Sequence, residues 1–490
     1  MTKEAENLYA TAPGDRPAWL AQLDLQMTID GEDAPANARS SLTDPCTEEP
    51  LATYPDAEMA HVDRSVEAAK RAFRNWSQTG WDERREALDS LAKAIGENHA
   101  ELAILLACET GRPLRKAWHE IHFSVEFVRM IAGVKLPARR FDQPGREIEL
   151  THRPLGVSGA IAPWNAPVIL GIAKVANALL AGDTVVLRPS PFTPLTALYL
   201  GRLGRSVLPP GVFNVITGDA SIGAALTVHP DVAKISFTGS TATGRRIAAA
   251  AAPQLKRLTL ELGGNDAAIV LKDADVEAFA DKVFEISLGN AGHFCSAAKR
   301  LYIHSDVFAD VRDALMAKAE AVVCGDNFDP STTMTPVQNR PQFDRIWSVI
   351  DDAVAHGGRV VTGAAREAGP GLFITPTLFE DISHGTMLVD EEQFGPVLPL
   401  IPFDDLEDAV AMANDSEYGL GGSIWSSDLD QATEWANRLE TGSAWINDHG
   451  SFSASVPMPS AKQSGIGTDY AHFGVAEHSR LMILNRKVSD

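Results

Sequence analysis

The sequence predicts an α/β protein built on a parallel β-sheet, and three observations lead to that prediction. Between residues 156 and 237, short runs rich in β-branched residues alternate with longer runs of helical periodicity, as in strands joined by crossover helices. A second alternating region extends from about Leu258 to Trp445 and could have a core of its own. The chain has 490 residues, more than one hydrophobic core usually serves, so we expect two or more domains.

Each run in these regions predicts one element. The predicted strands of the first region are 156–162, 184–187, 212–216 and 234–237, and its predicted helices are 168–181, 193–204 and one before the last strand. The strand-like runs of the second region are 267–271, 300–303 and 442–447. Ligands of parallel sheets bind at the carboxyl ends of the strands, so the loops after these runs are candidate sites.

The region before the first predicted strand combines an irregular segment with predicted helices. Residues 12–50 show little periodicity and predict an extended tail or lead-in. Apolar residues at helical spacing predict helices through 62–73 and 88–95, and Gly111 followed by Pro113 ends the helical region that precedes them.

Two further segments predict a projecting arm. The charged, alternating stretch 135–154 predicts a hairpin that turns at Pro144-Gly145, and the strand-like run 481–485 lies near the end of the chain. We expect this arm to pack on another subunit.

Composition excludes several classes of protein. The 43 basic and 65 acidic residues give a net charge of −22, which would repel nucleic acid and anionic lipid. The longest apolar stretch, 167–182, contains Lys174 and is too short to span a bilayer. The first ten residues lack the apolar run of a secretory signal and are unlike a basic transit peptide. We therefore expect a cytoplasmic protein that binds neither nucleic acid nor membrane.

The cysteines predict neither a disulfide framework nor a zinc cluster, because all four lie far apart in sequence: Cys46, Cys108, Cys295 and Cys324. Cys295 stands among glycine and small residues from Gly292 to Ala297, which leave room for a substrate. A lone cysteine is more often a buried small hydrophobe, and His293 is more often a structural polar residue than a base. The residues alone also allow a Cys/His hydrolase.

The run from Ile235 to Gly244 combines an apolar strand, a glycine turn and an alanine-rich helix. The free N–H groups and the positive dipole end of such a helix suit a pyrophosphate. The glycine spacing is not GxGxxG, so a plain strand–turn–helix connection is an equal alternative on these residues alone.

Two polar residues follow strand-like runs. Glu261 follows the apolar run 258–260, where a partly buried carboxyl has a raised pKa suited to general-base work, and a surface carboxylate is the alternative. Asn165, in the loop 162–167, offers N–H donors that can stabilise an oxyanion, and an ordinary turn asparagine is the alternative.

Six motifs in this order resemble the aldehyde dehydrogenase superfamily over about residues 27–485. They are Pro163-Trp164-Asn165, Phe237-Thr238-Gly239-Ser240, Glu261-Leu262-Gly263-Gly264, Cys295, Glu391-Glu392-Gln393-Phe394-Gly395-Pro396 and Lys462-Gln463-Ser464-Gly465-Ile466-Gly467. The resemblance implies a non-acylating, NAD(P)-dependent enzyme with a Rossmann-type cofactor domain, an α/β catalytic domain and a β oligomerisation arm.

The resemblance also implies catalytic roles. Cys295 would add to the aldehyde as a thiolate, while Asn165 and the backbone N–H of Cys295 would hold the oxyanion. After hydride transfer to the nicotinamide, Glu261 would activate the water that hydrolyses the thioester. Lys174 would help to relay the proton away from the glutamate, and Asp469 stands where a glutamate is commoner. The scheme needs no metal.

For the cofactor, NAD or NADP, the resemblance implies backbone contacts on one strand end, pyrophosphate contacts at the glycine turn, and contacts to the nicotinamide ribose and ring from the fifth motif. The residues expected there are Ile161, Trp164, Arg188, Ser190, Gly218, Phe237, Gly239, Ser240, Leu262, Glu392 and Phe394. One departure matters, because the family's usual Lys-Pro-Ser-Glu reads Arg188-Pro189-Ser190-Pro191. Arginine can pair with a 2′-phosphate, so we predict that NADP is tolerated.

Substrate identity depends on small residues at positions where many relatives have bulky aromatics. The expected tunnel residues are Ala166, Leu170, Ala173, Phe294, Phe452 and Met458, and Gly289 is another small position. No Arg or Lys stands out as a partner for a substrate carboxylate. We expect a bulky apolar substrate, that is, an aromatic, terpenoid or long aliphatic aldehyde.

Three alternatives remain beside this interpretation. A coenzyme-A-acylating semialdehyde dehydrogenase usually lacks the glutamate that corresponds to Glu261. A catalytically idle binding protein on the same fold would not need Cys295, Glu261 and Asn165 together. A Cys-dependent esterase would have no use for the Glu392 and Phe394 motif.

The sequence predicts three structural units and, by resemblance, a homodimer or a homotetramer. The cofactor-binding domain is expected at 1–134 and 155–260, the catalytic domain at 261–463, and the oligomerisation arm at 135–154 and 476–490.

Overall fold

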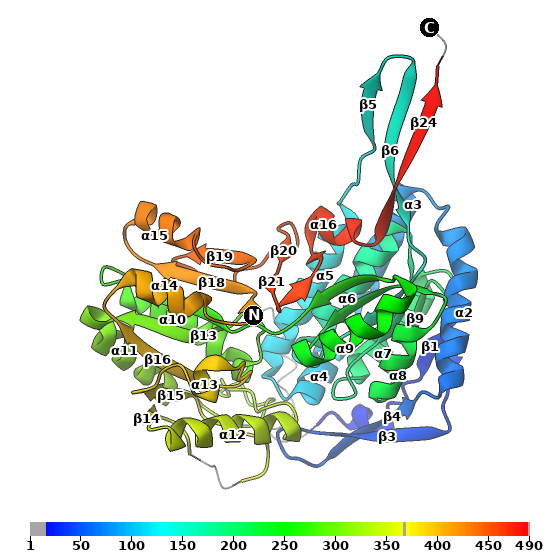
Figure 1. Ribbon diagram of the computed structural model, residues 1–490. Coiled ribbons are helices and arrows are strands. Elements are labelled where there is room, and N and C mark those ends of the chain that lie inside the picture. The colour runs from blue at the N-terminus through cyan, green and yellow to red at the C-terminus, as the bar shows by residue number, and fades with distance from the viewer. Residues whose placement is uncertain (1–15, 366–368, 489–490) are drawn as a thin grey trace.

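A computed structural model describes residues 16–365 and 369–488 of the chain. Two large, mostly parallel sheets lie in two halves of the molecule, each covered by helices, and a three-stranded arm projects from one half (Figure 1). The predicted α/β class is confirmed.

The first sheet has the strand order β2-β1-β9-β8-β7-β10-β11-β22. Its bounds are β1 (Met27–Ile29), β2 (Glu32–Ala34), β7 (Val157–Ile161), β8 (Thr184–Arg188), β9 (Phe213–Val215), β10 (Val232–Thr238), β11 (Arg257–Glu261) and β22 (Gly465–Ile466). The five strands from β9 to β11 are parallel. Along the chain, β8 and then β9 are added on one side of β7, and β10 then pairs with the other side of β7. This reversal makes the gap between β7 and β10 the switch point where such sheets bind ligands.

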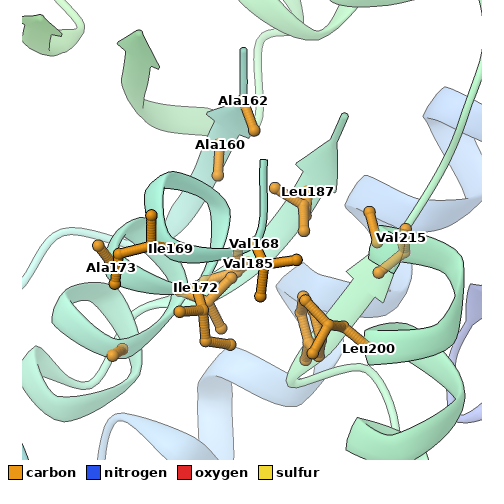
Figure 2. Packing of buried hydrophobic residues seen from close by; sticks show 14 of the residues in the cluster. Ala160, Ala162, Val168, Ile169, Ile172, Ala173, Val185, Leu187, Leu200 and Val215 are labelled. Atoms are coloured by element: carbon orange, nitrogen blue, oxygen red, sulfur yellow. The ribbon is translucent and has the colours of Figure 1, made fainter. Parts of the chain in front are cut away.

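Helices cover both faces of the first sheet. On one side α6 (Pro167–Ala181) and α7 (Leu195–Val207) pack on the strands, with α3 (Trp81–Glu97), α4 (His99–Thr110) and α5 (Leu114–Ala132) outside them. On the other side lie α2 (Met59–Trp76), α8 (Ala220–Val228) and α9 (Thr241–Ala251). Figure 2 shows the core beneath α6, where Val168 and Ile172 meet Val185 and Leu187 of β8. The helices predicted through 62–73, 88–95, 168–181 and 193–204 are confirmed.

The predicted lead-in at residues 12–50 is wrong for the part that the structure describes. β1 and β2 form an antiparallel pair at the edge of the first sheet, and β3 (Ala38–Thr43) pairs with β4 (Pro50–Asp56). Strands of three residues are too short to show alternation, and β1 is ordered by tertiary pairing, Thr28 opposite Val215 of β9. The beginning of the predicted lead-in, residues 12–15, lies outside the described residues.

The second sheet has the order β14-β15-β16-β13-β12-β18-β19 and is parallel except for β14. The strands are β12 (Asp266–Val270), β13 (Ala298–His304), β14 (Arg359–Thr362), β15 (Thr377–Glu380), β16 (Val397–Phe403), β18 (Gly421–Trp425) and β19 (Ser443–Ile446). Its helices are α10 (Val276–Leu288), α11 (Phe308–Glu320), α12 (Arg340–Ala355), α13 (Met387–Asp390), α14 (Leu406–Asn414) and α15 (Leu429–Ala436). The strands predicted near 267–271, 300–303 and 442–447 are confirmed.

The arm consists of β5 (Arg139–Gln143), β6 (Arg146–Pro154) and β24 (Ser479–Lys487), all antiparallel (Figure 1). The predicted turn at Pro144-Gly145 is present, and Gly145 takes the positive φ of 68° that the turn requires. β24 leaves Leu481, Ile483 and Leu484 more than half exposed. Among the described helices, none has the length and apolar composition needed to cross a bilayer.

Candidate functional site

Cys295 lies on a strained loop between the two sheets. The loop follows the 3-10 turn η3 (Gly289–Gly292), in which Asn290 and Ala291 have φ values of 54° and 52° and Gly292 has 73°. Left-handed conformations cost a non-glycine residue about 1–3 kcal/mol, so tertiary contacts must hold this loop in place. A Cβ at position 292 would collide with the carbonyl of Gly395, so only glycine allows the two loops to approach this closely.

Two cavities meet at Cys295. A small cavity of about 240 Å³ lies on the side of the first sheet's switch point, and a large cavity of about 560 Å³ lies on the other side. Three residues line both cavities, namely Asn165, Thr238 and Cys295. A thiol at this junction can be reached from both cavities.

The thiol of Cys295 is weakly acidic in the free site. Burial raises its pKa to about 11, and the ammonium of Lys299 is the main opposing influence. The thiol is therefore protonated at neutral pH, and forming the nucleophilic thiolate requires a proton acceptor.

Asn165 is fixed by hydrogen bonds on both its side chain and its backbone. Its amide nitrogen donates to the carbonyl of His293 at 2.9 Å. Its own backbone carbonyl accepts from Arg112 and from Asn290. Arg112 also pairs with Glu120, and both side chains are buried. One amide N–H of Asn165 remains free to face a ligand.

Glu120 connects this network to the start of α6. Its carboxylate accepts from the backbone N–H groups of Val168 and Ile169 at 3.0 and 3.2 Å. These N–H groups have no partner within the helix, and a carboxylate there also complements the helix dipole. The loop that carries Asn165 is therefore held at Asn165 itself and at the point where it enters α6.

Glu261 is the last residue of β11 and lines the large cavity. The side chain is buried, and neither carboxylate oxygen has a hydrogen-bond partner in the part of the chain that the structure describes. Burial raises its pKa well above the usual range, Asp469 raises it further, and Lys174 opposes both. Lys174 Nζ lies 3.6 Å from Asp469 Oδ2, so the buried ammonium and the two carboxyl groups form one cluster.

The glycines after Glu261 make room for two other groups. A Cβ on Gly263 would collide with the carboxylate of Glu392, and a Cβ on Gly264 would lie 2.6 Å from the carbonyl of Cys295. The N–H of Gly264 donates to Glu392 at 3.1 Å. Gly263 and Gly264 therefore allow the Glu261 motif to contact both Glu392 and the loop of Cys295, because a side chain at either position would collide with them.

The small cavity contains six of the predicted cofactor residues: Trp164, Gly239, Ser240, Leu262, Glu392 and Phe394. Ser240 is the N-cap of α9 and accepts from Thr243 N at 3.4 Å, so the N-terminus of this helix opens on the cavity. Donor-rich backbone suits a pyrophosphate, and a carboxylate beside an aromatic ring suits a ribose and a nicotinamide. The residues present therefore fit a dinucleotide.

Three rings stack on one side of this cavity. Trp164 meets His293 edge to face at 4.8 Å and Phe394 at 5.4 Å, while His293 stacks on Phe394. Burial lowers the pKa of His293 to about 3, so its imidazole is neutral. Together with its ring packing, this indicates a structural histidine.

The other predicted cofactor residues lie outside the walls of the small cavity, at the carboxyl edge of the same sheet. They are Ile161, Arg188, Ser190, Gly218 and Phe237. Ile161 pairs in register with Arg188 on one side and Phe237 on the other. The guanidinium of Arg188 is buried and donates to the carbonyl of Gly218 at 2.7 Å.

The large cavity contains five of the six predicted tunnel residues: Ala166, Leu170, Phe294, Phe452 and Met458. The prediction for Ala173 is wrong. Ala173 lies seven residues after Ala166 on the same face of α6, but about 10 Å further along the helix, where it packs into the core (Figure 2). Gly289 does line the cavity.

Sequence reasoning missed the contribution of α5 and α10 to this cavity. Arg112, just before α5, and Lys116, Glu120 and Phe123 on the helix line one wall, and Lys282 and Glu285 of α10 line another. The sequence singled out no Arg or Lys as a partner for a substrate carboxylate, and the structure places Arg112, Lys116 and Lys282 on the walls of this cavity. Helical spacing alone shows that residues 116, 120 and 123 share a face of α5, but not that the face meets Cys295.

Comparisons with known proteins agree with this arrangement. The model of the aldehyde dehydrogenase family matches residues 33–483. Aldehyde dehydrogenase LUC3 of a Fusarium species is 39% identical over 91% of this chain and 95% of its own length. Retinaldehyde dehydrogenase 3 of Rattus norvegicus is 35% identical over 93% of this chain and 91% of its own.

Among solved structures, an aldehyde dehydrogenase from Bacillus cereus in complex with NAD+ superposes with a TM-score of 0.95. It is 33% identical, and the match covers 98% of this chain and 100% of the other. The family match spans most of the chain, and the two cavities and their junction fit a dinucleotide beside a reactive thiol. The chain therefore belongs to the aldehyde dehydrogenase family and is an NAD(P)-dependent oxidoreductase that acts on aldehydes.

Proposed function

We propose that the chain oxidises bulky, apolar aldehydes to carboxylic acids through a covalent intermediate on Cys295. The observation that carries the proposal is the position of Cys295 at the junction of the two cavities. The sulfur adds to the aldehyde carbon to give a thiohemiacetal, whose oxidation leaves a thioester that water then hydrolyses. The large cavity is the substrate site and the small cavity is the nicotinamide site in this proposal.

Asn165 stabilises the oxyanion that forms when sulfur adds to the carbonyl. Its free amide N–H and the backbone N–H of Cys295 are the donors. Arg112 and Asn290 hold the backbone carbonyl of Asn165, so the amide is oriented before the substrate arrives. NAD or NADP, when bound against Glu392, Phe394 and the N-terminus of α9, supplies the acceptor for the hydride.

Glu261 is the general base that activates the hydrolytic water. Its unpartnered, buried carboxyl faces the large cavity and has a raised pKa, as a base working near neutral pH requires. In the proposed relay, Lys174 passes an N–H proton to the Asp469 carboxylate and then takes up the proton that Glu261 has removed from water. A glutamate so placed supports hydrolysis over transfer of the acyl group to coenzyme A.

The proposal of a bulky apolar substrate rests on the walls of the large cavity. Phe294, Phe452, Met458 and Leu170 supply apolar contacts, and Ala166 leaves space beside them. One relative is named for retinaldehyde, a bulky terpenoid aldehyde.

We also propose that NADP is accepted beside NAD. Arg188 stands at the carboxyl end of β8, where its guanidinium donates to the carbonyl of Gly218, and Pro191 replaces the family's usual glutamate, so that this position carries no carboxylate to repel a 2′-phosphate.

The two sheets with their helices, and the projecting arm, support the three predicted units. We propose residues 1–134 and 155–260 as the cofactor domain, 261–463 as the catalytic domain, and the arm at 135–154 and 476–490 as the contact in a homodimer or homotetramer. The exposed apolar residues of β24 support an oligomer contact. The four cysteines lie far apart in sequence and predict no disulfide framework, which supports a reducing, cytoplasmic location.

The test is the near-ultraviolet absorbance of reduced cofactor, with NAD and NADP separately, for acetaldehyde, a long aliphatic aldehyde and an aromatic aldehyde. We expect the larger aldehydes to have the higher kcat/KM and the Cys295→Ala variant to be inactive with all of them. A preference for acetaldehyde, or activity in Cys295→Ala, would contradict the proposal.

A further inference from the structure

The wall of the large cavity formed by α5 presents a lysine that the proposed mechanism does not use. Lys116, His119, Glu120 and Phe123 lie on one face of α5 and line the cavity that contains Cys295. The ammonium of Lys116 lies against Gly289, since a Cβ added to this glycine would be 3.6 Å from Nζ. The absence of a side chain at position 289 leaves the ammonium open to the cavity.

The other arginine and lysine side chains that line this cavity, Arg112 and Lys282, already have acidic partners. Arg112 pairs with the buried Glu120. Lys282 lies 2.8 Å from Asp448 and donates to Ser451 at 3.0 Å. Within residues 16–365 and 369–488, the ammonium of Lys116 has no hydrogen bond or ion pair, and the exposed Glu285 influences its pKa without pairing.

The surroundings of Lys116 disfavour an isolated positive charge. Burial lowers its pKa to about 8, Arg115 and Arg112 lower it as well, and Glu285 opposes them. The side chain is still charged at neutral pH, so a half-buried ammonium is left without a counter-ion. A bound anion would supply the missing partner.

We propose that Lys116 pairs with a carboxylate at the far end of the aldehyde substrate, while the apolar wall contacts the chain between the two ends. This inference rests on the proposed oxidation at Cys295. Cys295 and Asn165 line both cavities, so the aldehyde group of the substrate lies beside them. Lys116 lines only the large cavity and therefore contacts a different part of the substrate. The substrate class is then an apolar aldehyde that carries a distal carboxylate.

The test compares ω-oxo carboxylates of increasing chain length with n-alkanals of matching length. We expect one chain length at which the oxo acid has a kcat/KM about tenfold above that of its alkanal. Lys116→Met should remove this preference, Lys116→Glu should reverse it, and Lys116→Arg should retain it. A wild type without the preference, or a preference that survives Lys116→Met, overturns the inference while leaving the oxidation itself intact.

A second experiment distinguishes failure of this inference from failure of the proposed oxidation. Calorimetry with ω-hydroxy carboxylates and matching alkan-1-ols measures binding without turnover. Tighter binding of the hydroxy acid, lost in Lys116→Met, supports the carboxylate subsite even if no aldehyde is oxidised. Equal binding of the two compounds by the wild type overturns it.

Discussion

Lys299 Nζ lies 3.3 Å from Glu392 Oε1 and donates to the carbonyl of Cys295, so one buried ammonium joins the nucleophile's loop to the carboxylate of the small cavity. The same ammonium lies 5.9 Å from the centre of the Phe394 ring. It is also the main influence that lowers the pKa of the Cys295 thiol. A single side chain therefore supports both the thiol and the residues proposed to hold the nicotinamide.

Lys299→Met should impair both functions at once. Loss of the positive charge raises the thiol pKa further, so alkylation of Cys295 by iodoacetamide at neutral pH should slow about tenfold, the equivalent of one pKa unit. Glu392 loses its ionic partner, so KM for NAD should rise. Lys299→Arg keeps the charge and should restore both properties in part. Unchanged alkylation in a folded Lys299→Met variant would contradict this role.

Asn165→Ala should lower kcat about 100- to 1,000-fold, because one donor to the oxyanion is lost. Arg112→Met, which leaves the amide in place but frees the backbone carbonyl it holds, should cause a smaller loss. Steady-state kinetics with saturating cofactor measures both. Equal losses of kcat in the two variants would show that catalysis depends on the position of the loop and not on the amide of Asn165.

Turnover limited by thioester hydrolysis should rise with pH from neutral to alkaline values, because Glu261 acts as a base only when ionised and its pKa is raised. Lys174→Met removes a charge that lowers this pKa, so the rising limb should move to higher pH. Asp469→Asn removes a charge that raises it, so the limb should move to lower pH.

The pH dependence of Cys295 alkylation is the control for these two variants, since neither Lys174 nor Asp469 is among the main influences on the thiol. We expect the alkylation profile to stay in place in both. Shifts of turnover in the same direction for the two variants would contradict the assignment of Glu261 as the base.

Arg188→Met should weaken NADP binding about tenfold and affect NAD much less, because only NADP presents a 2′-phosphate to the guanidinium. Fluorescence titration with each reduced cofactor measures the two affinities. Equal weakening of both would show that the buried arginine, bonded to Gly218, only supports the local backbone.

The double change Leu481→Glu and Ile483→Glu should shift the assembly toward smaller species in sedimentation analysis. Both residues are about 60% exposed on β24, and charges there oppose an apolar contact between subunits. Leu255→Glu is the control, because Leu255 is 90% exposed away from the arm. An unchanged mass would exclude these side chains from the interface.

The sequence predicts most of the central elements because their signals are local. Buried parallel strands such as β7 and β8 are short runs of mostly apolar residues, and α6 lies between them in the chain with Gly182 at its end, at a φ of 98°. The edge strands β1 and β2 gave no such signal, since each has three residues and depends on pairing with its neighbours.

The residues of the site also differ in whether a local sequence signal predicts them. Cys295, Glu261 and Asn165 stand in recognisable motifs, whereas Lys299 and Lys116 enter the site only through packing between distant segments. The prediction places Ala173 in the tunnel because many relatives have a bulky aromatic at that position. The axial distance between Ala166 and Ala173 places Ala173 in the core, and no periodicity in the sequence reports that distance.

The most direct test of the account is the intact mass of a Glu261→Gln variant after incubation with NAD and an aldehyde. Without the base, the thioester should accumulate, so the protein should gain the mass of the aldehyde minus two hydrogens, with the added group mapped to Cys295. The variant that also carries Cys295→Ala should gain nothing. An adduct on another residue, or turnover by the double variant, would contradict covalent catalysis by Cys295.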